Sequence, residues 1–94
     1  MKNLLKAVLD SMSDLFSRYG ITSTFIEGAF GGSCSANLDS SKYVGTVTHW
    51  PESRFEFQFN DCVSGDVILL ETKEMSNEEE LKKYLEELVL KMLV

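Results

Sequence analysis

Residues 54–60 read Arg-Phe-Glu-Phe-Gln-Phe-Asn, a strict alternation of aromatic and polar side chains. Successive side chains of a β-strand point to opposite faces, so the three phenylalanines share one face while Glu56 and Gln58 share the other. Each ring that is buried stabilises the fold by about 2–3 kcal/mol, so the aromatic face requires a covering layer. The pattern therefore predicts a sheet with one covered face and one face open to solvent.

Neighbouring strands are predicted on both sides of this segment. Their links contain Gly, Ser, Asp or Pro and are short, as is typical of antiparallel hairpins. One turn is expected at Gly28 and Gly31–Ser33, and Pro51 ends the strand before residues 54–60. The β-branched and aromatic composition predicts strands over residues 21–27, 43–50 and 66–72 and a weaker strand over 35–38.

Two amphipathic segments flank the strands. In residues 3–19 and again in residues 77–93, apolar side chains recur at three- and four-residue steps, which predicts helices. Gly20 ends the first helix, and Ser76 with Glu79 predicts a capping box at the start of the second. One apolar stripe per helix suffices to cover one sheet face. The sequence thus predicts a single α+β domain over residues 1–94, with an antiparallel sheet of four to five strands flanked by an N-terminal and a C-terminal helix.

The charge distribution limits the kinds of partner. The chain has 15 acidic and 9 basic residues, a net charge of −6. Residues 1–47 are balanced, with four charges of each sign, whereas residues 48–94 hold eleven acidic and five basic groups. Nucleic acids and anionic membranes are bound through basic groups, so neither is expected as a partner. A basic protein surface is the natural complement.

The sequence also predicts a cytoplasmic location. Asp10 and Asp14 interrupt the apolar start of the chain, which is therefore a poor export signal. No apolar run approaches the roughly 18 residues of a membrane span. Without an export signal, Cys34 and Cys62 are expected to be reduced thiols and not a disulfide.

No catalytic centre, metal site or cofactor is expected. His49 is the only histidine and has no partner at a metal-ligand spacing, so a structural or surface role is favoured. Acidic neighbours of Cys62 disfavour a reactive thiolate. Asp61 and Asp66 lack the spacing of a calcium-binding EF-hand, and the glycines of residues 28–33 lack the lysine of a phosphate-binding loop. The chain is therefore interpreted as a binding protein and not an enzyme.

A partner-binding surface is expected on the open face of the sheet and in the turn after residues 54–60. Tryptophan is enriched among interface hot spots, although a core position for Trp50 is the equal alternative. Carboxylates would complement a basic partner. The expected surface consists of Trp50, Glu52, Glu56, Gln58, Asp61 and Asp66.

The stretch His49-Trp50-Pro51, followed by residues 54–71 (RFEFQFNDCVSGDVILLE), resembles immunity proteins of bacterial polymorphic toxin systems. The most similar family is the TriTu type, which accompanies Rhs-borne ADP-ribosyltransferase toxins acting on elongation factor Tu. The resemblance implies a protein kept inside the producing cell, where it binds a cognate toxin domain and blocks its active site. The family has no fixed active-site motif, so the resemblance assigns no individual residue.

Two other functions remain open from the sequence. An acidic secretion chaperone, which is usually a dimer and binds an unfolded effector segment, has a similar size and composition. An enzyme that removes the toxin's modification is the second alternative. It is disfavoured by the single histidine and the missing metal motif.

Overall fold

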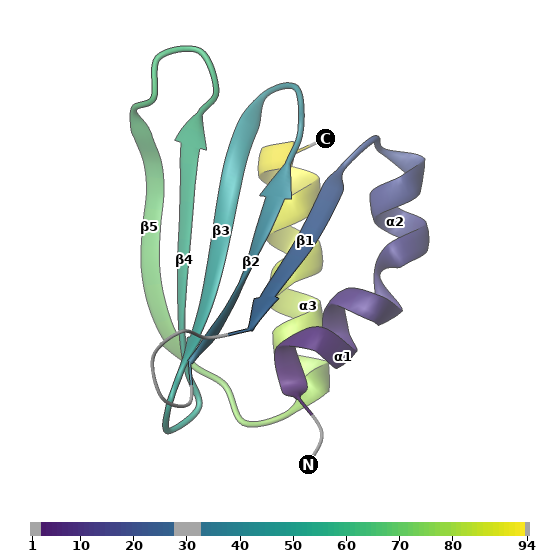
Figure 1. The fold of residues 1–94 in the computed structure, drawn as a ribbon, viewed down its shortest axis with the longest axis vertical. Coiled ribbons are helices and arrows are strands. Elements are labelled where there is room, and N and C mark those ends of the chain that lie inside the picture. The colour runs from purple at the N-terminus through teal and green to yellow at the C-terminus, as the bar shows by residue number, and fades with distance from the viewer. Residues whose placement is uncertain (1–2, 28–32, 94) are drawn as a thin grey trace.

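The computed structural model describes residues 3–27 and 33–93. Two short helices precede five strands, and a third helix follows them (Figure 1). The elements are α1 (Leu4–Ser11), α2 (Ser13–Arg18), β1 (Thr22–Glu27), β2 (Cys34–Asp39), β3 (Tyr43–Trp50), β4 (Arg54–Asp61), β5 (Val67–Glu74) and α3 (Glu78–Leu88), which continues as a π-helix (Val89–Leu93). The turn predicted at Gly28 and Gly31–Ser33 falls almost wholly outside the described residues.

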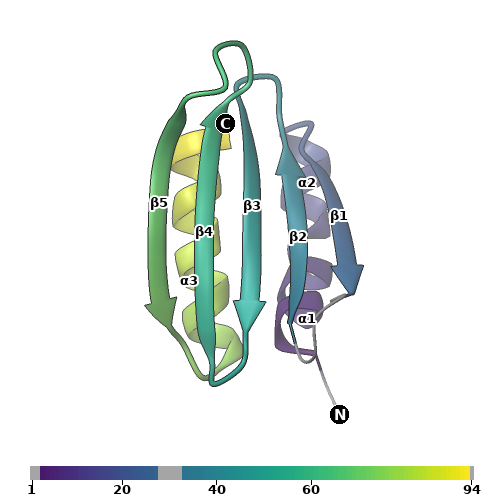
Figure 2. The same cartoon turned by 60° about the vertical axis from the view of Figure 1, so that its left-hand side comes forward.

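The sheet is an antiparallel meander in the order β1-β2-β3-β4-β5. All three helices lie on one side of it, with α3 behind β4 and its neighbours and with α1 and α2 behind β1 and β2 (Figure 2). The predicted fold class is therefore confirmed, with five strands and a helical layer that both ends of the chain supply.

The core lies between the sheet and the helices. Phe55, Phe57 and Phe59 are fully buried, as the alternation of β4 predicts. They belong to one buried cluster with the helices: Tyr84 of α3 packs on Phe57, and α1 packs against α3. The helical residues that expose 1% or less of their surface are Leu5, Val8, Leu81, Leu85 and, in the π-helix, Val89. This one-sided core is what leaves the other sheet face uncovered.

The helix predicted over residues 3–19 is interrupted at Met12. Its N–H is shared between the carbonyls of Val8 and Leu9, at 3.1 Å each, and α2 begins at the next residue. The Ser11 hydroxyl donates to the Val8 carbonyl at 2.7 Å, a local bond that competes with the helical pattern. Gly20 ends the second segment with φ of 66°, as predicted.

The predicted capping box at Ser76 and Glu79 is wrong by one residue. Asn77 is the N-cap of α3: its side-chain oxygen accepts the Glu80 N–H at 2.9 Å, and its amide donates to the Glu80 carboxylate at 2.8 Å. Met75 is buried and its N–H donates to the Ser53 carbonyl, so the chain remains extended past the end of β5. The turn into the helix is therefore delayed, and asparagine caps a helix as well as serine does.

His49 lies on the core side of the sheet, which supports the structural interpretation of this residue. Its ring stacks on Phe55, its register partner, with centroids 4.2 Å apart and planes 13° apart. Burial lowers the pKa of His49 from its usual value of 6.5. Burial therefore favours the neutral imidazole.

Gly45 is required by the ring of Phe59. The two residues are register partners on the covered face, and a Cβ at position 45 would collide with that ring. We expect Gly45→Ala to destabilise the protein by about 1–3 kcal/mol through overpacking. Urea denaturation measures this change. Thr46→Val, the adjacent position on the other face, is the control, with an expected change within about 0.5 kcal/mol; equal effects of the two variants would contradict the packing argument.

The His49 pKa predicts a pH dependence of stability. As the pH falls, the unfolded chain binds a proton on this imidazole near the usual pKa, whereas the folded protein binds it only at a lower pH. The free energy of unfolding is therefore highest above the usual pKa and decreases as the pH falls below it. We expect wild type to lose more free energy of unfolding than His49→Phe between a pH one unit above and a pH one unit below 6.5. Urea titrations at both pH values measure the difference, and parallel losses would refute it.

Candidate protein-binding surface

One face of the sheet carries no helix in the part of the chain that the structure describes (Figure 2). We call it the open face. Burial alternates along β2 and β4, so every second residue of these strands belongs to it, and the register extends the set to β3 and β5. Its central residues are Asn37, Thr46, Thr48, Trp50, Glu56, Gln58, Leu70 and Thr72.

Four of the six residues expected to bind a partner lie on or beside this face. Glu56 and Gln58 are half-buried in the middle of β4. Trp50 is half-buried at the end of β3, opposite Arg54, and not in the core, so the structure rejects the core alternative. Glu52 is exposed in the adjoining β3–β4 turn, with φ of 67°.

The other two residues lie at the opposite end of the sheet. β4 has eight residues, so Asp61 is roughly 23 Å from its start at about 3.3 Å per residue. Its carboxylate accepts the N–H groups of Ser64 and Val63, at 2.9 and 2.8 Å. These two bonds, that of Ser64 foremost, lower the pKa of Asp61. Asp61 therefore shapes the β4–β5 turn, whereas Asp66 is exposed beside β5.

Sequence reasoning missed the apolar side chains that β5 exposes. Val67, Ile68 and Leu70 are 54, 48 and 59% exposed. A bulge between Phe59 and Asn60 pairs Asn60 with Val67 and leaves Ile68 as the extra residue. The apolar run in DVILLET resembles a buried strand, and its exposure follows only from the position of β5 at the sheet edge.

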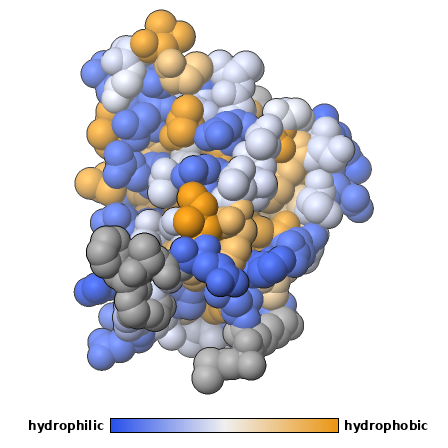
Figure 3. All heavy atoms as spheres, in the orientation of Figure 1, coloured by the Kyte–Doolittle hydropathy of each residue, from blue (hydrophilic) through white to orange (hydrophobic). Residues whose placement is uncertain are grey.

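The surface of the protein mixes polar and apolar atoms. In the view of Figure 3, hydrophobic atoms form separate spots between hydrophilic ones. A mosaic of this kind is typical of surfaces that bind another folded protein reversibly, because such interfaces are about as apolar as ordinary protein surface. The face of the molecule in this view is therefore compatible with a partner that also exists alone.

In the described residues, the histidine and cysteine side chains do not form a reactive cluster on the open face. Cys34 and His49 are register partners on the covered side, but the Cys34 thiol contacts the Asn3 side-chain amide and His49 stacks on Phe55. The Cys62 thiol donates to the Ser41 carbonyl at 3.0 Å. Within residues 3–27 and 33–93, His, Cys, Asp and Glu form no group of three or more that could hold a metal ion.

The helices of the structure are too short to cross a bilayer: none in the described segments is long and apolar enough to do so.

Comparison with known proteins identifies the family. A search of curated proteins found no significant match. A family model described as immunity protein TriTu matches residues 4–91, from the start of α1 into the π-helix, and so includes the whole open face. Immunity proteins act on a cognate toxin by binding it, and this family is non-enzymatic. The chain belongs to the TriTu immunity protein family.

Proposed function

We propose that the protein neutralises a cognate ADP-ribosyltransferase toxin that acts on translation, by binding the toxin domain with the open face and covering its active site. Membership of the TriTu family implies that the protein neutralises a toxin. The toxin's activity is proposed from the resemblance to proteins that accompany Rhs-borne toxins. Binding would take place in the cytoplasm of the producing cell, where the newly made toxin is a danger. The observation that carries the proposal is a sheet face left uncovered in a family whose members work by contact.

Charge supports a basic partner. All of the net negative charge belongs to residues 48–94, which include β4, β5 and α3. Glu52, Glu56, Asp61 and Asp66 are spread along the length of β4 and its two turns. Opposite potentials of this kind accelerate association and exclude like-charged proteins, with an effect that salt weakens. Toxins that act on translation components are often basic, so the acidic side would match them.

The dimensions of the sheet indicate how far the contact must extend. Five strands about 4.8 Å apart make a sheet about 19 Å wide and, with the length of β4, roughly 440 Å² in projection. Stable protein–protein interfaces bury about 800 Å² on each partner. The open face alone is therefore too small, and we infer that the toxin also contacts the turns or an edge of the sheet.

The first experiment is a tagged pull-down from the native bacterium with mass spectrometry of the co-purified proteins. We expect a large protein that ends in a compact toxin domain, bound at a one-to-one ratio to this chain. Recovery of an unfolded effector segment on a dimer of this chain would instead assign it to the secretion chaperones. NAD-dependent modification by the recovered domain, and its loss when this chain is added, would test the toxin class and its inhibition.

Glu56 provides the test of the open face. Glu56→Lys replaces an attraction to a basic partner with a repulsion in the middle of that face, so we expect the Kd for the recovered toxin domain to rise by about tenfold or more. Isothermal titration calorimetry measures it. Asp14→Lys changes the net charge equally from an exposed position on α2 and is the matched control. Similar losses in both variants would show that only total charge matters, and unchanged binding in both would exclude this face.

Asp61 needs a different substitution because its carboxylate also holds the turn. Asp61→Asn retains the side-chain oxygen that accepts from Ser64 and Val63 while it removes the charge. Asp61→Ala removes both. A contact role predicts weaker binding in both variants, whereas weakening in the alanine variant alone would assign Asp61 to the turn.

A further inference from the structure

The outer edge of β5 is available for pairing. β5 is the last strand in the sheet order, and no strand in the described ranges lies beyond it. The Met75 N–H donates to the Ser53 carbonyl on the β4 side, at 2.9 Å. Since amide direction alternates along a strand, the N–H groups of Leu70, Thr72 and Glu74 face outward. An edge of this kind is a template for one more strand.

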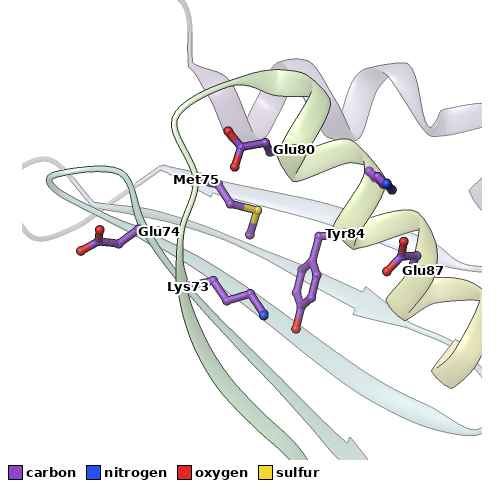
Figure 4. A pocket seen from close by; sticks show the side chains of 7 residues that line it. Lys73, Glu74, Met75, Glu80, Tyr84 and Glu87 are labelled. Atoms are coloured by element: carbon purple, nitrogen blue, oxygen red, sulfur yellow. The ribbon is translucent and has the colours of Figure 1, made fainter.

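A groove runs beside this edge, between β5 and α3 (Figure 4). It consists of two adjoining hollows of about 420 and 190 Å³, which share Lys73, Tyr84 and Glu87. Met75 and Glu80 line the larger hollow, and Leu69 lines the smaller one. We call it the β5–α3 groove. An edge strand flanked by a helix-lined groove is the arrangement in which extended peptides bind by strand addition, with main-chain bonds to the strand and alternate side chains in the groove.

The charged side chains on the groove side of β5 are held against α3. Tyr84 donates a short hydrogen bond to the Glu71 carboxylate, and the Lys73 ammonium lies 4.9 Å from the centroid of the Tyr84 ring. Tyr84 is itself fixed by an edge-to-face contact with Phe57 at 4.8 Å. Lysines often protect an edge strand by projecting across it. Figure 4 shows Lys73 directed toward Tyr84, so its side chain does not project across the outer edge of β5 and does not block that edge.

The two sides of β5 specify the chemistry of a strand that would lie beside it. On the open-face side, Ile68 and Leu70 are about half exposed and suit apolar side chains. The groove is lined by four carboxylates and three ammonium groups, and α3 begins with three glutamates, so basic side chains have a small advantage there. A second copy of this chain fits poorly, because it would bring its own net charge of −6 against an acidic edge.

We propose that the toxin domain contributes an extended segment, with apolar and basic residues in alternation, that pairs with β5 as a sixth strand of the sheet. This proposal rests on the proposed function. The added strand would extend the open face without a break, because Thr72 and Leu70 are the register partners of Glu56 and Gln58. It would also supply part of the contact area that the open face alone lacks.

Amide hydrogen exchange tests the pairing directly. The isotope-labelled protein is measured by NMR alone and with the toxin domain recovered in the pull-down. We expect binding to slow exchange at Leu70, Thr72 and Glu74 by about tenfold or more, while Glu71 and Lys73 are already protected by β4. Binding without this alternating protection would overturn the proposal and leave the proposed function intact. Failure of the toxin domain to bind at all would reject both.

Two further outcomes are distinguished by the same measurement. Protection of the three outward amides in the free protein that grows with protein concentration would show that a second copy occupies the edge, which contradicts the proposal. Uniform protection along β5, including residues that β4 already pairs, would indicate general tightening of the sheet and would also contradict it.

Thr72 offers an independent test by substitution. Thr72→Pro removes an outward N–H without removing a bond to β4, a position in which edge strands accept proline. We expect its Kd for the toxin domain to exceed that of Thr72→Val by about tenfold, because both variants change the same side chain of the open face and only the valine variant keeps the N–H. Circular dichroism reports whether each variant is folded. Equal binding by both folded variants would overturn the proposal, and the exchange experiment decides it if the proline variant does not fold.

Discussion

Burial of three phenylalanine rings on one side of β4 determines most of the architecture. Because the aromatic side chains of this strand all point the same way, the sheet needs a cover on that side only. Helices from both ends of the chain provide it, and α1 and α3 pack against each other in that layer. Consequently, no helix of residues 3–27 and 33–93 covers the opposite face. The surface proposed for toxin binding is thus a direct product of how the core is built.

Local patterns in the sequence were enough to predict the fold class and the two faces of β4. The alternation of β4 placed Glu56 and Gln58 correctly, and Gly20 marked the end of the first helical region. The interruption at Met12 and the shift of the cap to Asn77 were not predicted. The Ser11 hydroxyl bonds the Val8 carbonyl, and the Asn77 side chain bonds the Glu80 N–H; periodicity reports neither bond.

The candidate site was less predictable because it depends on contacts between distant residues. Alternation within β4 placed Glu56, but the sequence left Trp50 between core and surface and could not show that Asp61 folds its own turn. The edge position of β5 follows from the order of all five strands. The groove beside it requires Tyr84 of α3 to meet Glu71 and Lys73, which no single segment of sequence encodes.

The order of elements along the chain has a consequence for synthesis. Since α3 follows every strand and its Tyr84 packs on Phe57, a nascent chain that has emerged only as far as β5 leaves part of its phenylalanine face exposed. Such an intermediate offers exposed aromatic surface to chaperones and proteases. Folding therefore waits for α3 to leave the ribosome. Burial of the phenylalanine face is therefore complete only after α3 has been synthesised.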